Sequence, residues 1–555
     1  EQNKLIKKYY EFYQYGTFSS KIKEILSGAK NEREIKYKVN KYFSNRLLIV
    51  DEYHNLRDTT TNLSDSENKL KNKEANSALN YLFKTIKYST NLRIIFLSAT
   101  PMYNNSTEIF LLLNLMLLND NRPLINEKQY IKNGIITKEG KDLINKKCRG
   151  YISYLRGENP ISFPIRLYPT DKLTIKPVDA PKIDLFGNRV EDPLKFLITY
   201  KNKFKTNGYQ SEIYKKYLDI FLKTKEEKDE LKVGINKQLP QLCNIAYPSL
   251  QNKHMGEEGF LEVFSKSGNS FKYKKNKNIT VPVLHEKYVS NISIKLKNIL
   301  KNIKTSNGIV FIYTDYIWSG AIPLGIALEH IGFNKYNGKN LLNSDQKDEA
   351  LNYDMRKKSV MKKDEQFNRA NYIILSGNGM VSGDNDNELK VLKSEENKNG
   401  EKIKVVIGSS ITGEGIDFKN IREIHIMDPW YHLNKLEQII GRGIRFCSHS
   451  MLEKSKHNVT VFIHTAVYGD NETIDHYNYR LGERKSIEIG EIEMILKRNA
   501  LDCYLFKEGN VIKKSDVSPM KLIDSKGKER IEQVYDKEYT KICSFQNTCD
   551  YKCIN

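Results

Sequence analysis

The sequence predicts an α/β protein built on parallel sheets. Short apolar segments rich in Ile, Val and Phe alternate with helical stretches over much of the chain. Few polar residues interrupt these segments, a pattern typical of strands buried on both faces of a parallel sheet. The chain has 555 residues, of which 28% are charged and 39% hydrophobic, as in a soluble globular protein. This length corresponds to roughly three or four domain-sized units.

The strand candidates form two groups along the chain. The earlier group comprises residues 47–50 and 93–97, and the later group comprises 308–314, 372–375, 403–407, 423–427 and 459–464. A Lys-rich stretch with helical pieces and a part containing Gly and Asn separate the groups. We therefore expect a first sheet domain over 1–165, an inserted or linker domain over 166–290, a second sheet domain over 291–480, and a mainly helical C-terminal extension with a Cys-rich tail over 481–555.

The net charge, the cysteine content and the hydropathy limit which partners and compartments are expected. The formal net charge of +22 favours a polyanionic partner, although the bias of an AT-rich genome towards Lys explains the same surplus. The seven cysteines are few and mostly scattered, at Cys148, Cys243, Cys447 and Cys503, which indicates a reducing compartment. The longest apolar run, 109–118, is too short to span a bilayer, so no membrane partner is expected.

The first chemical motif is the segment 47–58, LLIVDEYHNLRD, an apolar strand that leads directly into two carboxylates. The carboxyl ends of parallel strands are where α/β sheets bind ligands. Asp51 is expected to hold Mg²⁺, and Glu52 to orient and deprotonate a water that attacks a γ-phosphate. A strand followed by an ordinary acidic turn is the alternative, because this pattern is common by chance.

The second motif is the segment 93–105, RIIFLSATPMYNN, another apolar strand that ends in small hydroxyl residues. Asn105 and Glu108 are spaced to cap the next helix. Ser98, Ala99 and Thr100 are candidates to couple the acidic site to a facing domain. Simple turn chemistry is the alternative.

Two further motifs lie in the second group of strands. The segment 405–430, VVIGSSITGEGIDFKNIREIHIMDPW, predicts a strand, a glycine-rich turn and a strand. In that turn Gly413 and Gly415 allow a phosphate or nucleic-acid backbone to approach, and Asp417 is placed to accept a hydroxyl or order the loop. The segment 433–446, LNKLEQIIGRGIRF, predicts a helix carrying Arg442 and Arg445 on one face, where guanidinium groups suit phosphoryl charge. A solvated basic helix is the alternative.

These motifs stand in the order DExH, SAT, G-x-G-x-D and Q-x-x-G-R-x-x-R, and the ordered set resembles superfamily 2 DExH helicases and translocases over about residues 45–480. The segments VDEYHNLRD, LSATPMYN, GYISYLRGENPISFPIRLYP and ERKSIEIGEIEMILKRNALDC are closest to helicases of nucleocytoplasmic large DNA viruses. That group includes poxvirus-type early transcription factor and termination ATPases and the RNA helicases of asfarvirus- and mimivirus-like genomes.

The resemblance implies two RecA-like domains that bind ATP and Mg²⁺ between them. It implies nucleic-acid-stimulated ATP hydrolysis in viral transcription or RNA handling, in host cytoplasm or virion. DNA or RNA is the implied partner, with viral RNA polymerase or transcription-factor subunits. The implied catalytic residues are Glu52, Gln438, Arg442 and Arg445, and the implied cofactor-binding residues are Asp51, His54, Gly413, Gly415, Asp417 and Gly441.

One motif of the family is missing from the sequence. A Walker A loop, G-x-x-x-x-G-K-[ST], should stand upstream of the DExH strand, and only the stretch 27–30, SGAK, approaches it. We expect an N-terminally truncated helicase rather than a degenerate homologue, because both carboxylates and both arginines are present. The chain alone is then expected to hydrolyse ATP poorly.

The chain ends in Cys543-x5-Cys549-x3-Cys553, with Cys503 upstream. Three or four thiolates can hold Zn²⁺, so zinc is a candidate cofactor here, and free thiols on a reduced tail are the alternative. Two rival functions also stay open. One is a non-catalytic transcription-factor subunit that uses the helicase scaffold to bind DNA. The other is the motor of a restriction or repair complex, for which we find no nuclease motif.

Overall fold

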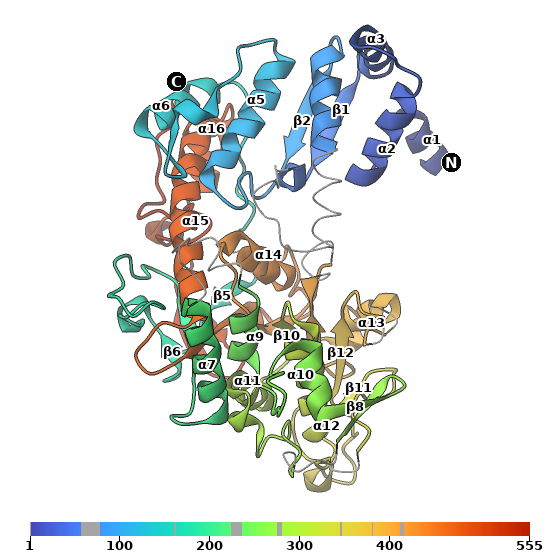
Figure 1. Cartoon of the computed structure of the whole chain (residues 1–555), viewed down its shortest axis with the longest axis vertical. Helices are drawn as coiled ribbons and strands as arrows, with labels where there is room; N and C mark the ends of the chain where they lie inside the picture. The colour runs from blue at the N-terminus through green and yellow to red at the C-terminus, as the bar shows by residue number, and fades with distance from the viewer. Residues whose placement is uncertain are drawn as a thin grey trace. The chain divides into compact units, whose positions relative to one another are not determined.

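The computed structural model describes residues 2–56, 78–159, 162–223, 236–274, 280–344, 347–379, 381–383, 385–410 and 416–554 (Figure 1). Contacts divide the chain into two compact units. The first unit is Glu1–Gly157, Glu488–Asn510 and Asp550–Asn555, and the second unit is Glu158–Ile487 and Val511–Cys549. Residues 166–290, expected as an inserted domain, therefore lie in the same compact unit as 291–480. The predicted boundaries of functional domains stay predictions.

The first unit is built around two parallel strands. Its elements are α1 (Gln2–Tyr9), α2 (Tyr15–Leu26), α3 (Glu32–Phe43), β1 (Leu47–Asp51), a helical stretch at 78–88, β2 (Arg93–Leu97), α5 (Ile109–Asn119), β3 (Ile131–Lys132), β4 (Ile135–Ile136), α6 (Lys138–Lys147) and α16 (Cys503–Asn510). The predicted strands at 47–50 and 93–97 are confirmed, and they pair in register from Leu47 with Arg93 to Asp51 with Leu97. α5 is the apolar run 109–118, and it lies in the core of this unit.

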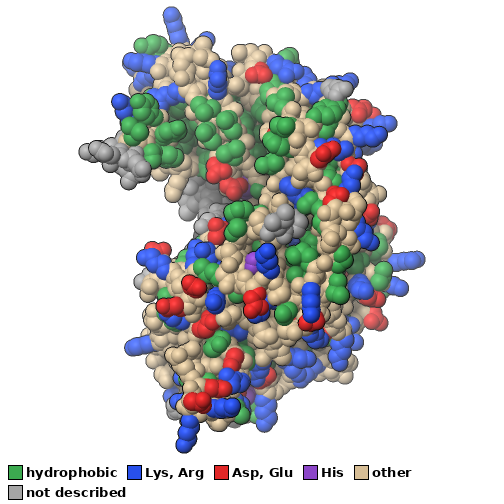
Figure 2. Space-filling model, turned by 180° about the vertical axis from the view of Figure 1, so that it is seen from behind, with side chains coloured by type: hydrophobic (Ala, Val, Ile, Leu, Met, Phe, Trp, Pro, Cys, Tyr) green, Lys and Arg blue, Asp and Glu red, His purple; other side chains and the backbone are tan. Residues whose placement is uncertain are grey.

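The expectation that strands are buried on both faces is wrong for β1 and β2. Their alternate residues Leu47, Ile49, Ile95 and Leu97 are each 44% to 55% exposed. Because side chains alternate across a strand, these residues form one uncovered apolar face. Figure 2 shows hydrophobic side chains gathered on the surface of the first unit.

The second unit contains a nine-stranded sheet in the order β11-β12-β13-β10-β14-β15-β7-β6, with β5 also paired to β15. The strands are β5 (Ile165–Leu167), β6 (Thr174–Ile175), β7 (Thr199–Lys203), β10 (Ile309–Tyr313), β11 (Asn334–Lys335), β12 (Asn371–Leu375), β13 (Val405–Gly408), β14 (Ile421–Ile426) and β15 (Asn458–Val467). All neighbours pair in parallel except β6 and β7. The five later strand predictions are thus confirmed.

Helices cover both faces of this sheet. They are α7 (Tyr209–Lys223), α9 (Gln238–Asn244), α10 (Gly256–Val263), α11 (Ile294–Lys304), α12 (Ile322–His330), α13 (Asn385–Leu392) and α14 (Leu433–Gly443). Val310 and Ile312 of β10 pack with α10, α11 and α12, whereas Phe311 and Tyr313 pack with α14. β10 is consequently buried along its whole length, as its apolar sequence predicts.

The C-terminal region is helical first, as expected. α15 (Ile474–Arg498) begins in the second unit and ends in the first. The tail also contains an antiparallel hairpin of β16 (Met520–Ile523) and β17 (Glu529–Glu532), which the sequence pattern did not reveal. A second hairpin, β8 (Phe264–Ser267) and β9 (Ser270–Tyr273), lies beside α10.

A fully buried ion pair joins several elements of the second unit. Lys295 Nζ lies 2.7 Å from Asp475 Oδ2, and both side chains are 0% exposed. The ammonium also donates to Asn244 Oδ1 and to the carbonyl of Met427, at 3.0 and 2.8 Å. Asp475 Oδ2 accepts from Ala466 N at 2.8 Å. These bonds connect α9, α11, the end of β14, β15 and α15, and they offset part of the cost of burying the two charges.

We predict that Lys295→Met lowers the free energy of unfolding of the second unit by about 3–5 kcal/mol, because Asp475 is left as an uncompensated buried charge. Urea denaturation followed by tryptophan fluorescence measures the change. Lys301→Met, an exposed position on the same helix, is the matched control and should stay within about 0.5 kcal/mol. Equal denaturation midpoints for the two variants would contradict the prediction.

Candidate active site

The DExH and SAT segments meet at one sheet edge of the first unit. Asp51 is the last residue of β1 and pairs with Leu97, the last residue of β2. Because the two strands are parallel, Glu52 and Ser98 both follow at the same carboxyl edge. The structure therefore brings together two predicted groups of site residues that are 46 positions apart in the sequence.

The backbone at the two carboxylates is held in an unusual shape. Glu52 has φ +49°, in the left-handed region that side chains other than glycine seldom adopt. The Tyr15 hydroxyl donates to the carbonyls of Asp51 and Glu52 at 2.5 and 3.2 Å, and Asp51 Oδ1 accepts from Glu52 N at 3.0 Å. Burial, with the nearby Asp51 and Glu52 charges, raises the pKa of Tyr15, so it remains a donor. Strained backbone of this kind is frequent at functional sites. The sequence pattern gave no signal for Tyr15.

His54 connects the base candidate to the SAT segment. Its buried Nδ1 lies 2.9 Å from Ser98 Oγ, 3.4 Å from Thr100 Oγ1 and 3.3 Å from Glu52 Oε2. Its ring stacks on Tyr103 with centroids 5.4 Å apart. The imidazole thus lies between a carboxylate and two hydroxyls.

Local capping holds the SAT loop in place. Ser98 Oγ accepts from Thr100 N at 3.0 Å, and Ala99 between them is exposed. Asn105 caps the 3-10 turn Ser106–Glu108 by accepting from Thr107 N, which confirms its predicted capping role. Glu108 turns back and accepts from Tyr103 N at 2.6 Å. These bonds satisfy backbone donors that the loop would otherwise leave unpaired.

In the second unit the two arginines converge on Asp417. Arg445 Nε lies 3.0 Å and an Arg442 terminal nitrogen 3.9 Å from Asp417 Oδ1. Phe418 N donates to the carbonyl of Arg442 at 3.0 Å, which ties this loop to the end of α14. Arg445 and Asp417 are 43% and 60% exposed at their side chains, so both are accessible to a ligand.

The expectation that Arg442 and Arg445 share one helix face is wrong. α14 ends at Gly443, and Arg445 follows the cap at Ile444. Gly443 packs so closely on β14 that a Cβ there would lie 2.9 Å from Ile424 Cδ1. The chain consequently leaves the helix before Arg445, and the common partner Asp417, rather than helical spacing, brings the two guanidinium groups together.

The other predicted residues of the second unit are placed as follows. Gln438 lies half-buried on α14. A Cβ at Gly441 would meet no atom within 4 Å, so packing does not require glycine there. Gly413 and Gly415 lie outside the described residues.

A cluster of charged side chains that the sequence analysis missed lies at the carboxyl ends of β10 and β14. Lys435 Nζ is 2.7 and 2.8 Å from the Asp315 carboxylate oxygens and 3.9 Å from the Trp430 ring centre. Asp428 Oδ2 accepts from Asp315 N at 2.6 Å. Burial and the neighbouring Asp315 raise the pKa of Asp428 to about 6. The available signal was Asp315 itself, a carboxylate directly after an apolar strand.

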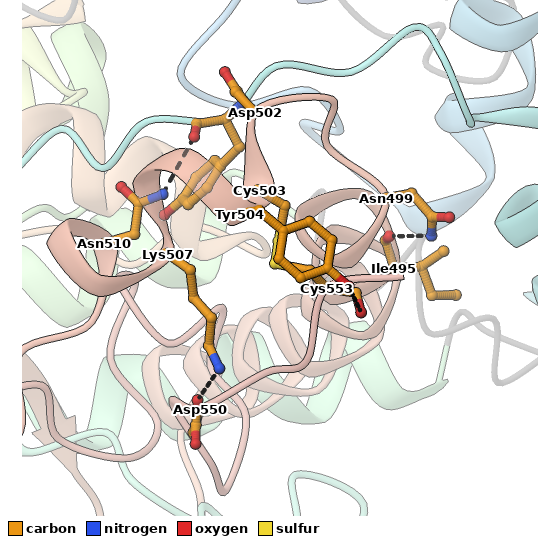
Figure 3. Close-up of a disulfide and its surroundings, with 10 residues drawn as sticks. Ile495, Asn499, Asp502, Cys503, Tyr504, Lys507, Asn510, Asp550 and Cys553 are labelled. Atoms are coloured by element: carbon orange, nitrogen blue, oxygen red, sulfur yellow. Dashed lines mark hydrogen bonds and ion pairs between the residues drawn. A yellow bond between two sulfur atoms is a disulfide. The ribbon is translucent and has the colours of Figure 1, made fainter. Parts of the chain in front are cut away.

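The tail cysteines form two disulfides instead of one metal cluster. Cys503 pairs with Cys553 in the first unit, and Cys543 pairs with Cys549 in the second. Figure 3 shows Tyr504 and an ion pair between Lys507 and Asp550 around the first disulfide. Among the described residues no three His, Cys, Asp or Glu side chains are grouped to hold a metal. The structure therefore gives no support to zinc at these four positions, and Cys503 is not an isolated thiol.

The candidate site can also be placed among known proteins. The helicase conserved C-terminal domain matches residues 332–447, which include Asp417, Arg442 and Arg445. "Putative ATP-dependent RNA helicase R563" of Acanthamoeba polyphaga mimivirus is 28% identical, over 91% of this chain and 72% of that protein. The chain thus carries a helicase C-terminal domain and is similar to superfamily 2 helicases of large DNA viruses. The two strands of the first unit and the mostly parallel sheet of the second fit the RecA-like architecture of that family.

Two further relatives of this helicase come from other large DNA viruses. "Putative helicase 087L" of Invertebrate iridescent virus 3 is 25% identical, over 90% of this chain and 43% of that protein. "Termination factor NPH-I homolog" of African swine fever virus (isolate Tick/South Africa/Pretoriuskop Pr4/1996) is 24% identical, over 82% of this chain and 63% of that protein. This helicase spans 43% to 72% of the length of the three relatives. No described helix is long and apolar enough to cross a membrane.

We predict that Glu52→Gln in this helicase leaves ATP binding nearly unchanged and lowers hydrolysis by at least about a hundredfold, the scale for loss of a positioned general base. The assay measures phosphate release and nucleotide affinity on the chain together with any polypeptide encoded upstream in its reading frame. Glu127→Gln, an exposed carboxylate of the same unit, is the control and should retain full turnover. Unchanged turnover of Glu52→Gln would remove this residue from the mechanism.

Proposed function

We propose that this helicase couples ATP hydrolysis to movement along, or separation of, nucleic-acid strands. One observation carries the proposal. Each unit presents groups that phosphoryl transfer requires: in the first, a carboxylate linked to the SAT hydroxyls through His54, and in the second, two arginines gathered on one aspartate. Phosphoryl transfer needs these two kinds of group, a water-positioning base and cationic forks.

Asp51 fits the requirements of Mg²⁺. This ion keeps several waters and is held in proteins by one or two carboxylates together with substrate phosphates, so it needs no dedicated cage. Asp51 stands at the strand end, with one carboxylate oxygen bonded to Glu52 N. Mg²⁺ bound there would neutralise charge on the phosphate oxygens. Glu52 accepts a proton from the attacking water, and His54 holds its carboxylate in position.

The arginines act from the second unit. Gln438, Arg442 and Arg445 contact the phosphates, with Arg445 reaching the γ-phosphate. Asp417 keeps both guanidinium groups in place, which limits the conformational entropy lost when they meet a phosphate. Gly441 is the described glycine of this set, and a Cβ there would meet no atom within 4 Å, so backbone is accessible to a ligand. Ser98 and Thr100 couple the ATP site to the facing domain through their contacts with His54.

Nucleic acid is the proposed second substrate, and the net charge of +22 supports it. The name of the African swine fever virus relative supports a role in viral transcription, with RNA polymerase or transcription-factor subunits as partners and the host cytoplasm or virion as location. An ATPase assay of the chain together with any polypeptide encoded upstream in its reading frame, with and without single-stranded DNA or RNA, tests the whole proposal. Nucleic-acid binding without any nucleotide turnover would instead favour a non-catalytic DNA-binding subunit.

We predict that, in the chain together with any polypeptide encoded upstream in its reading frame, Arg445→Ala lowers turnover much more than nucleotide affinity. The reason is that the charge it meets develops mainly in the transition state. Arg445→Lys should restore little, since a point charge does not replace a planar fork. Steady-state kinetics and nucleotide titration separate the two effects. Arg189→Ala, an exposed arginine of the same unit, is the control. Equal losses of turnover and affinity would contradict a transition-state role.

We also predict that affinity for single-stranded nucleic acid falls steeply as salt rises, because binding releases counterions from the phosphate backbone. Fluorescence anisotropy with a labelled oligonucleotide over a range of KCl concentrations gives the slope of log affinity against log salt. A slope close to zero would show that the charge surplus reflects composition and not a binding surface.

A further inference from the structure

A polar pocket lies at the amino edge of the second unit's sheet. Its volume is about 210 Å³, and its lining includes Gly308, Lys404, Arg422 and Lys456. Gly308 and Lys404 directly precede β10 and β13, and Arg422 is the second residue of β14. These are amino ends of parallel strands. The lining includes neither Asp417 nor Arg442 nor Arg445, so the pocket is distinct from the arginine cluster.

Two cations of this pocket are buried without a carboxylate partner. Lys404 and Arg422 are 1% and 4% exposed. Within the described part of the chain, neither lies within 4.0 Å of an Asp or Glu oxygen, the limit that every recorded ion pair meets. Both donate to neutral groups instead. Lys404 Nζ bonds the carbonyl of Ser306 at 2.8 Å, and Arg422 bonds the carbonyls of Lys456 and Ile523 at 2.7 and 2.6 Å.

One hydrogen-bond donor at this pocket also lacks an acceptor among the described residues. Arg422 Nε is buried and has no hydrogen-bond partner among the described residues. Gly308, with φ +100°, leaves room for the Arg422 side chain, because a Cβ at that position would collide with it. Asp524 and Glu423 favour the charge of Arg422 only from beyond 4.0 Å. A buried charge without a directly paired carboxylate, and a buried donor without an acceptor, are both unfavourable unless something else satisfies them. A bound anion satisfies both.

The acidic residues of the pocket are engaged elsewhere. Asp354 pairs with Arg356 at 2.7 Å. Asp524 Oδ1 accepts from the backbone of Lys526 and Lys528 at 2.9 and 3.0 Å. Lys398 and Lys456 add two more cations to the lining. The pocket consequently presents four cationic side chains and only two carboxylates, which are bonded to neighbouring groups.

We propose that this pocket binds a small oxyanion of the phosphate class, with Arg422 and Lys404 as its principal ligands. Guanidinium and ammonium groups are the side chains that proteins use for phosphate and sulfate. This inference concerns a site distinct from the proposed ATP site and does not depend on the proposed function.

The C-terminal hairpin forms one wall of the pocket. Ile523 and Asp524 line it from the end of β16 and the turn that follows. Asn307 N donates to the carbonyl of Ser525 at 2.7 Å, so this turn is already bonded to the sheet edge. An anion held between Arg422, Lys404 and this wall contacts both parts, and binding should protect the hairpin amides from hydrogen exchange.

Binding should also depend on pH in a defined direction. Burial lowers the pKa of Lys404 to about 8, with Glu423 and Asp354 favouring its charge and Lys526 opposing it; Glu401 also favours it. Below about pH 8 Lys404 is charged, and above it the free pocket loses that charge. An anion favours the charged form and raises the pKa of Lys404 on binding. Affinity should therefore be constant below pH 8 and fall as pH rises above it. Sulfate is the suitable probe, because its own charge does not change over this range.

The test is isothermal titration calorimetry of the full chain at low ionic strength. Sulfate gives the pH profile, and inorganic phosphate and a 5′-mononucleotide at pH 7.5 distinguish a free anion from a phosphate ester. Lys404→Met should weaken binding at least tenfold and abolish the fall above pH 8. Lys335→Met is the matched control and should bind as the parent does. Lys335 is a partly buried lysine of the same unit, outside the pocket, that also donates to a carbonyl and whose pKa burial also lowers.

Arg422 also donates to backbone carbonyls, so its replacement can affect folding as well as binding. Sulfate binding by Arg422→Gln is therefore interpreted only if the thermal unfolding midpoint of the variant matches that of the parent. Lys398→Ala, at a half-exposed position of the lining, provides a variant with little risk to folding and should weaken binding about two- to fivefold, as for a solvent-exposed charge pair. Absence of sulfate and phosphate binding by the parent would overturn the proposal. Binding that Lys404→Met and Lys398→Ala leave unchanged would overturn it as well.

Discussion

Parallel strand pairing is the constraint on which both candidate sites depend. It places the carboxyl ends of strands that are distant in sequence at one edge of a sheet, and their amino ends at the other. In the first unit this brings Glu52 and His54 beside Ser98 and Thr100. In the second unit it puts Asp315 and Asp428 at one edge and Lys404 and Arg422 at the other. An antiparallel arrangement of the same strands would scatter these groups over both edges.

The charged groups of the second unit fall into three environments with different consequences. Lys295 and Asp475 are fully buried and paired with each other, so they join elements and have no exposed atom to offer a ligand. Arg442 and Arg445 share an exposed aspartate, so a phosphate can exchange with that partner at modest cost. Lys404 and Arg422 are buried and, among the described residues, hydrogen-bonded only to neutral groups, which favours an anion as a directly paired counter-charge.

Some expectations failed because a local pattern does not contain the packing that overrides it. The spacing of Arg442 and Arg445 is helical, yet the close contact of Gly443 with β14 accompanies an earlier end of the helix. The near-continuous apolar sequence of β1 and β2 is typical of strands covered on both faces, yet one face is uncovered in the described residues. Cysteines spaced irregularly along the tail form disulfides with partners up to 50 residues away, a pairing that spacing does not specify.

The sequence by itself determined the α/β class, the seven predicted strands and the order of the helicase motifs, because periodicity and short motifs are local properties of the chain. It also indicated Glu52, Ser98, Thr100, Arg442 and Arg445 as a set. Only the tertiary structure decided that His54 bridges Glu52 to the hydroxyls, that Tyr15 holds the DExH backbone, and that Asp417 gathers the arginines. It alone revealed the pocket around Lys404 and Arg422. The physical reason is that burial and ion pairing depend on which side chains meet across strands and loops, and sequence spacing does not record those distances.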